Sequence, residues 1–270
     1  MKKILFLASV LFLAACGSDS PAADEKAEAA EILKNVVPNI EGVWVMEDYI
    51  SKMESTRSPK AASDVLDGIV GIDINKASIR VDSMEGGVNW NNHEGNGFTI
   101  YFKKGIAENS VQSGLADEKG FFDIGYADSS LVLYHYDANK KLLDKRIFTK
   151  VLRKQLNSDL SFGIQYIVNK KLLKGTYTCT DSLNNKSDVE LTVDGKIKGL
   201  GDYKYYLAGT DFMDAYSNLD YMTLLKDEKT AEAFGYTSKN DSVKIYTLHQ
   251  DESKGTIFYG KLRYALVKKN

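Results

Sequence analysis

The sequence has few of the residues that cross-link a fold, bind metals or interrupt strands. Its 270 residues include two cysteines, three histidines and three prolines, and no proline follows Pro59. Two cysteines exclude a fold that depends on a disulfide framework. All 16 tyrosines lie after residue 48, and an aromatic sequence without proline favours pleated strands over disorder. We therefore expect a mostly β protein.

The body of the chain also has no excess of charge. Residues 1–15 contain two lysines and no acid, and residues 17–41 contain two lysines and six acids. Removing these from the totals of 35 basic and 37 acidic residues leaves 31 of each sign in residues 42–270. A neutral body does not attract phosphates through a basic field, so we expect no nucleic-acid partner.

The N-terminus has the pattern of a secretory signal, which we assign to residues 1–15. Lys2 and Lys3 precede an apolar run from Ile4 to Ala15, which is shorter than the ~20 residues that cross a bilayer. The run ends in Leu13-Ala14-Ala15-Cys16, which resembles the cleavage box of bacterial lipoproteins. The alternative is an ordinary signal peptide in which the cysteine has no role.

The resemblance implies that Cys16 accepts a diacylglycerol and, with two or three acyl chains, anchors the protein stably to a membrane. Gly17 follows it, which resembles lipoproteins sorted to the outer membrane, so we expect a lipid-anchored protein of the cell envelope. Residues 16–27 are acidic and rich in Ser and Ala, as is typical of a flexible tether. If Cys16 is lipidated, Cys179 has no disulfide partner, and its strand context predicts a small buried side chain.

The remaining sequence repeats one pattern. Gly42-Val43-Trp44 opens the first unit and Gly175-Thr176-Tyr177 opens the second, each behind a short helical pattern. Each unit closes on a basic strand, at 146–154 and at 263–269. We infer a duplication, with domains at residues 28–157 and 158–270.

Between these marks the sequence predicts antiparallel strands without crossover helices. Asp194-Gly195 between two alternating segments is a strong hairpin signal. We expect an all-β fold of two tandem up-and-down barrels, each preceded by a short helix; one continuous sheet across both halves is the alternative. The expected strands lie near 42–48, 68–74, 77–83, 97–103, 120–127, 130–136, 143–153, 175–181, 187–193, 196–200, 203–208, 219–225, 231–238, 242–248 and 255–267.

Each of the two units resembles the lipocalin-type (calycin) barrel. In that family an Arg on the last strand covers the Trp of the first and closes one end of the barrel. The resemblance implies that Trp44 meets Arg146 and that Tyr177 meets Arg263, as cation–π contacts of ~0.5–2 kcal/mol. It also implies that residues 48–67 fold as a lid over the mouth of the first barrel, which is where a ligand would bind.

The sequence contains no catalytic or cofactor motif, and we expect neither a cofactor nor a metal. His93, His135 and His249 share no ligand spacing. The Gly- and Asn-rich segment 85–97 surrounds Trp90, which predicts either a loop that stacks on a sugar or lipid, or a hairpin turn whose indole packs on its own barrel. The candidate ligand contacts are Trp90, His93, Tyr49, Met53, Tyr101 and His135.

These patterns predict a non-enzymatic, lipid-anchored lipoprotein that holds a small apolar or amphipathic ligand in its first barrel. The alternative is a structural or interaction lipoprotein with solid barrels, which binds another envelope protein or a glycan through its outer faces and the 85–97 loop. A hydrolase that uses His93 or His135 is a third possibility, without a supporting motif.

Overall fold

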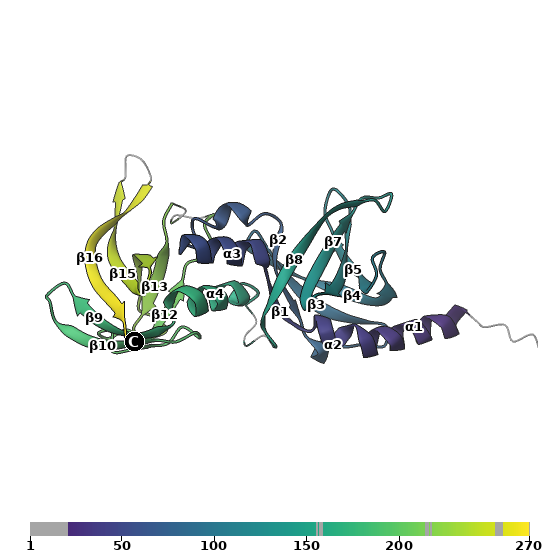
Figure 1. Cartoon of the computed structure of the whole chain (residues 1–270), viewed down its shortest axis with the longest axis horizontal. Coiled ribbons are helices and arrows are strands. Elements are labelled where there is room, and N and C mark those ends of the chain that lie inside the picture. The colour runs from purple at the N-terminus through teal and green to yellow at the C-terminus, as the bar shows by residue number, and fades with distance from the viewer. Residues whose placement is uncertain are drawn as a thin grey trace, which may run out of the picture.

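The computed structural model describes residues 21–154, 156, 159–213, 216, 218–251 and 256–269. Two β units lie side by side, with helices α3 (Glu47–Thr56) and α4 (Phe162–Val168) between them (Figure 1). The expected signal peptide and Cys16 lie outside the described residues, and so does the expected boundary between residues 157 and 158.

The first unit is a closed barrel of eight antiparallel strands, in which each strand pairs with the next and the last pairs with the first. The strands are β1 (Gly42–Met46), β2 (Ile69–Ile74), β3 (Ser83–Trp90), β4 (Glu94–Lys104), β5 (Ser110–Ala116), β6 (Phe121–Ala127), β7 (Ser130–Tyr136) and β8 (Leu142–Leu152).

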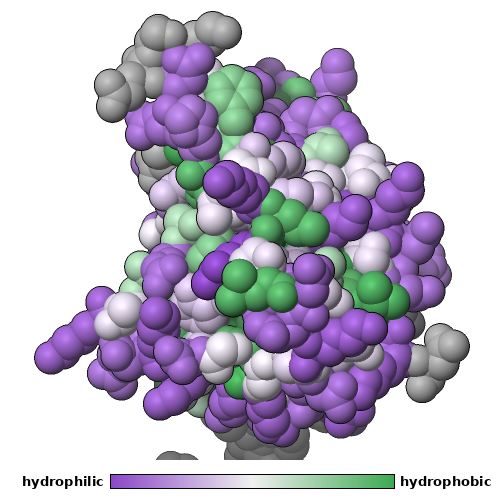
Figure 2. Space-filling model, turned by 90° about the vertical axis from the view of Figure 1, so that its left-hand side faces the viewer, coloured by the Kyte–Doolittle hydropathy of each residue, from purple (hydrophilic) through white to green (hydrophobic). Residues whose placement is uncertain are grey.

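The second unit is an eight-stranded antiparallel sheet in the order β11-β10-β9-β16-β15-β14-β13-β12. A bridge between Lys196 and Tyr205 brings its two edges together, so this barrel is nearly closed. Seen from the side away from the first unit, its surface is mainly hydrophilic, with separate hydrophobic patches (Figure 2). The strands are β9 (Gly175–Asp181), β10 (Lys186–Leu191), β11 (Ile197–Lys198), β12 (Tyr205–Ala208), β13 (Tyr221–Leu225), β14 (Ala231–Lys239), β15 (Ser242–Asp251) and β16 (Thr256–Lys268). The predicted fold class, two tandem antiparallel barrels, is confirmed.

A helical segment leads into each barrel and makes the same contact in both. Helices α1 (Pro21–Asn35) and α2 (Val37–Ile40) precede β1, and α4 with the π-helical turn η3 (Asn169–Leu173) precedes β9. The indole N–H of Trp44 donates to the carbonyl of Ile40 over 2.7 Å, and the hydroxyl of Tyr177 donates to the carbonyl of Leu173 over 2.5 Å. Because α1 begins at Pro21, the expected tether is helical from that residue onward.

The cation over Trp44 is Lys150, and the predicted pairing with Arg146 is wrong. Lys150 Nζ lies 4.5 Å from the centre of the indole, since Trp44 and Lys150 are opposite each other in the β1–β8 register. Arg146 lies four residues earlier on β8 and donates to the carbonyl of Asp67 instead.

The second barrel departs from the prediction in the same way. Its register places Lys268 of β16 opposite Tyr177. Arg263 lies earlier on the strand, where it donates to Ser182 Oγ over 3.1 Å and stands 5.5 Å from the ring of Tyr264. Both units therefore place a lysine, and not an arginine, opposite the first-strand aromatic residue.

Side chains of the first barrel fill its interior. Buried residues from β2 to β8 belong to one hydrophobic cluster, and many of them are at most 2% exposed. Examples are Ile72, Met84, Ile100, Phe102, Val111, Ile124, Leu133 and Phe148.

The segment 85–97 is a β-hairpin within the sheet, and the strand expected at 77–83 is wrong. Residues 76–78 form a short 3-10 helix (η2), and β3 begins at Ser83. Three of the four glycines that suggested a loop, Gly86, Gly87 and Gly95, lie close to other side chains. A Cβ added to Gly87 would lie 2.4 Å from Leu160 Cδ2, and one added to Gly86 would lie 2.7 Å from the Phe98 ring. Strand β5 was also missed by the sequence prediction.

The segment 48–67, expected as a lid over the first barrel, contacts strands β1 and β8 of that barrel and also docks on the second unit. It contains α3 and the short 3-10 helix η1 (Ser63–Val65). The apolar face of α3 is buried, and the helix ends at Arg57, whose φ is 56°. The Arg57 guanidinium donates to the carbonyl of Lys171 over 3.0 Å and to Ser238 Oγ over 2.8 Å. The backbone N–H of Lys60 donates to Asp220 Oδ1 over 2.7 Å.

Candidate functional site

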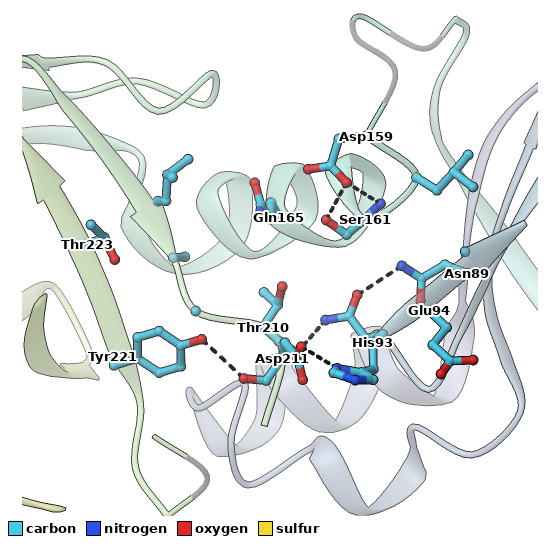
Figure 3. A pocket seen from close by; sticks show the side chains of 16 residues that line it. Asn89, His93, Glu94, Asp159, Ser161, Gln165, Thr210, Asp211, Tyr221 and Thr223 are labelled. Atoms are coloured by element: carbon cyan, nitrogen blue, oxygen red, sulfur yellow. Dashed lines mark hydrogen bonds and ion pairs between the residues drawn. The ribbon is translucent and has the colours of Figure 1, made fainter. Parts of the chain in front are cut away.

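A cleft of about 530 Å³ lies where the two units meet. Three segments far apart in the sequence form its walls: the β3–β4 turn of the first barrel, the start of α4, and β12 with the chain that leads to β13 (Figure 3). Its lining residues are Asn89, Asn92, His93, Glu94, Gly95, Asp159, Leu160, Ser161, Gln165, Leu207, Ala208, Gly209, Thr210, Asp211, Tyr221 and Thr223.

The β3–β4 turn places two polar side chains against the second unit. Asn91 and Asn92 have φ angles of 51° and 54°, a left-handed conformation that asparagine tolerates better than most residues. His93 Nδ1 then lies 2.7 Å from Asp211 Oδ2, and the Asn92 amide donates to the carbonyl of Thr210. These two contacts tie the turn to the second barrel across the cleft (Figure 3).

Asn89 contributes a buried acceptor that lacks a donor. Its side chain lines the cleft and is only 4% exposed. Its amide nitrogen donates to Asn92 Oδ1 over 3.3 Å, while its Oδ1 has no hydrogen-bond partner. Leaving a buried polar atom unpaired costs ~1–3 kcal/mol, so a bound group that donates a hydrogen bond to this atom, after a small shift of the cleft wall, would be favoured.

Carboxylates dominate the charge of the cleft. Glu94, Asp159 and Asp211 line it together with a single imidazole, His93. Asp159 Oδ1 accepts hydrogen bonds from the backbone N–H and the hydroxyl of Ser161, over 2.8 and 2.7 Å. Such a lining disfavours an anionic ligand and suits one that presents hydroxyl or amine donors.

His93 is the one candidate ligand contact from the sequence that lines this cleft. Trp90 packs against the core of its own barrel and donates from Nε1 to Asn96 Oδ1 over 2.7 Å, as the hairpin alternative predicts. Tyr101 is 42% exposed on β4. Neither residue lies with His93 in the cleft.

The other three candidates are buried. Tyr49 and Met53 of α3 have no exposed surface, and burial, with a smaller contribution from Asp220, raises the pKa of the Tyr49 hydroxyl. His135 is 4% exposed and stacks on Phe122 at 4.2 Å between ring centres.

The surroundings of His135 make it a wall residue of the first barrel. Its Nε2 lies 3.1 Å from Asp117 Oδ1 and its Nδ1 lies 3.3 Å from Asp144 Oδ2. Burial alone would raise the pKa of Asp117, but the backbone N–H groups of Lys119 and Gly120 and the imidazole outweigh it, and the pKa falls. Carboxylates therefore occupy both ring nitrogens.

Sequence reasoning missed most of the cleft because no local pattern marks it. Asn89, Gln165 and Asp211 come together only when the two units dock. The available signal was the density of asparagine in 85–97. Cys179 is 2% exposed, as predicted, and burial raises the pKa of its thiol.

The described part of the chain shows neither a metal-binding cluster nor a membrane-spanning helix. It contains no group of three or more His, Cys, Asp or Glu side chains placed to hold a metal ion. None of its helices is both long and apolar enough to cross a membrane.

No protein-family model, no curated protein and no solved structure gives a significant match to the chain.

Proposed function

We propose that the protein is a non-enzymatic binding lipoprotein of the cell envelope, which holds a polyhydroxylated, glycan-type ligand in the cleft between its two barrels. The unpaired, buried Oδ1 of Asn89 in the cleft wall carries this proposal. A sugar hydroxyl is a donor of the required kind, and it can in turn accept a hydrogen bond from a neighbouring amide.

The composition of the cleft supports a glycan over an apolar ligand. Amides, carboxylates and hydroxyls provide most of the lining, while Leu160 and Leu207 provide apolar contact area. Buried hydrophobic side chains occupy the interior of the first barrel, and the cavity of about 740 Å³ beside its helical lead-in is lined by charged residues and amides as well as by Ile32 and Val36.

The anchor and the family form the other part of the proposal. We propose that Cys16 carries the lipid, that the protein resides in the outer membrane, and that the barrels are lipocalin-like. The lipoprotein-type sequence around Cys16 and the barrel that follows each helical lead-in support this. Mass spectrometry of the protein from its own host tests the anchor: a Cys16→Ser variant without the added acyl mass supports it, and an unmodified Cys16 contradicts it.

Binding of neutral oligosaccharides, including fragments of envelope polysaccharides, tests the cleft by calorimetry. Asn89→Leu keeps the number and branching of the side-chain heavy atoms but removes the acceptor, together with the amide that donates to Asn92. We expect at least tenfold weaker binding, since a lost hydrogen bond to a bound ligand costs ~1.5 kcal/mol. Tyr101→Ser on the exposed face of β4 is the matched control and should bind normally. If Asn89→Leu binds as tightly as the wild type, or if only lipids are extracted with the protein, the cleft proposal is wrong.

A further inference from the structure

A second, smaller cavity lies at the opposite end of the α4–η3 segment from the cleft. Its volume is about 110 Å³, and it forms where the end of α3 meets the second barrel. Of its six charged lining residues, five are cations and one is Asp241. The cations are Arg57, Lys170, Lys171, Lys174 and Lys268. Residues 42–270 contain equal numbers of basic and acidic residues, so this excess of positive charge is specific to the cavity.

We propose that this cavity binds a phosphate group. Lysine and arginine are the residues that bind phosphate through charge-assisted hydrogen bonds. The cavity has room for a few water-sized groups, at ~30 Å³ each, which suits one tetrahedral oxyanion. Asn240 and Ser242 add neutral polar groups to the lining.

The helix dipole explains only part of the cluster. Lys170 and Lys171 lie in the last turn of η3 and Lys174 is its C-cap residue, and cations are favoured at this end by the carbonyl groups. Lys268 comes from β16, and Arg57 comes from the other unit. The three lysines of this segment already balance the partial negative charge at its C-terminal end. The helix dipole therefore does not explain why β16 and α3 add two more cations at the same place.

Arg57 has an unused donor at this position. Its terminal nitrogens donate to the carbonyl of Lys171 and to Ser238 Oγ, and more weakly to the carbonyl of Asn240 at 3.4 Å. Its Nε is buried and has no hydrogen-bond partner. A buried cationic N–H without an acceptor is costly, and an anion in the cavity that Arg57 lines would remove this cost.

Lys174 and Lys268 are the lysines most available to an anion. Lys171 Nζ is 2.7 Å from Glu54 Oε1, and Lys170 Nζ lies 6.0 Å from the centre of the Tyr166 ring. Lys174 and Lys268 form no ion pair with any carboxylate of the described residues. An anion held by these two side chains and Arg57 would link the first unit to the second.

The test is a titration of the full-length chain in an uncharged detergent, at constant ionic strength, followed by the melting temperature and by calorimetry. We expect inorganic phosphate to raise the melting temperature more than chloride does. Lys174→Gln with Lys268→Gln should weaken phosphate binding at least tenfold. Lys244→Gln, on an exposed position of β15, is the matched control and should leave binding unchanged.

A short-chain phosphatidic acid in the same titration distinguishes a lipid headgroup from the free ion. Tighter binding of the lipid assigns the site to a headgroup, and tighter binding of inorganic phosphate assigns it to the free ion. Equal responses to phosphate and chloride, or equal phosphate affinity in the double variant and the control, would overturn the proposal. Because Lys174 and Lys268 do not line the glycan cleft, these results are independent of those for Asn89.

Discussion

Gly87→Ala tests whether the glycines of the β3–β4 hairpin are there for packing. The added Cβ would lie 2.4 Å from Leu160 Cδ2, whereas ordinary contact begins at about 3.4 Å. Leu160 must therefore move by ~1 Å. Because the contact is with the end of a flexible, partly exposed side chain, we expect the lower end of the ~1–3 kcal/mol that overpacking costs. Without a clash, alanine in place of a strand glycine would stabilise the protein by ~0.5–1 kcal/mol.

The hairpin contains its own control. Gly97 is paired with Gly87 across the two strands, but a Cβ added there would have only the carbonyl oxygen of Gly86 nearby, at 3.8 Å. Gly97→Ala should therefore be neutral or slightly stabilising. The two glycines are the two members of one ladder pair, and of these two only Gly87 lies against Leu160. We therefore expect the two substitutions to change the free energy of unfolding in opposite directions.

Urea unfolding of both variants, alone and combined with Leu160→Ala, measures the effect. We expect Gly87→Ala to lower the free energy of unfolding, and we expect Leu160→Ala to relieve most of that loss, giving a coupling of ~1 kcal/mol or more. Equal stabilities of Gly87→Ala and Gly97→Ala, or additive effects with Leu160→Ala, would refute the packing argument. Because Leu160 also lines the cleft, Gly87→Ala should weaken glycan binding too.

Two further predictions concern the first barrel. Lys150→Met combined with Trp44→Leu in a double-mutant cycle should give a coupling of ~0.5–2 kcal/mol in the unfolding free energy. Arg146→Met should couple to Trp44→Leu by less than ~0.3 kcal/mol. The reverse result would show that Arg146, and not Lys150, interacts with Trp44. Burial raises the pKa of Asp73 from 3.8 to about 6, so the folded state binds this proton more tightly than the unfolded state. The contribution of Asp73 to the free energy of unfolding is greatest below pH ~4, and it is lost as the pH rises through about 6. Since Asp73 is partly exposed, we expect Asp73→Asn to add ~1–2 kcal/mol at pH 7 and little at pH 4; urea midpoints that shift equally at both pH values would contradict this.

The two tandem barrels could be predicted from the sequence because local patterns identify their helices and strands. The Gly42 and Gly175 openings, the helical lead-ins and the alternating strands of the second unit each depend on neighbours a few residues away. Such patterns identify an element and its buried face, and the strands of the second unit lie close to their expected positions.

The closure residues required knowledge of register, which local patterns do not contain. Arg146 and Lys150 lie on the same face of β8, and only the register of β8 against β1 decides which of them is opposite Trp44. A shift along the partner strand exchanges them without altering the hydrophobic pattern. The β3 strand was missed for a related reason. Its Gly87 packs against Leu160, which is distant in the sequence, so no local pattern shows why a glycine is needed in this strand.

The asymmetry between the two copies explains why both proposed sites lie at their junction. Each barrel uses its interior for its own core, and each closes one end with its own helical lead-in. Segment 48–67 and the 85–97 hairpin are the parts of the first unit that reach the second. Two buried polar atoms without a hydrogen-bond partner, Arg57 Nε and Asn89 Oδ1, belong to these two parts. If binding depends on the junction, Arg57→Ala, which removes the clamp on the second unit, should weaken glycan and phosphate binding together, although Arg57 lines only the phosphate cavity.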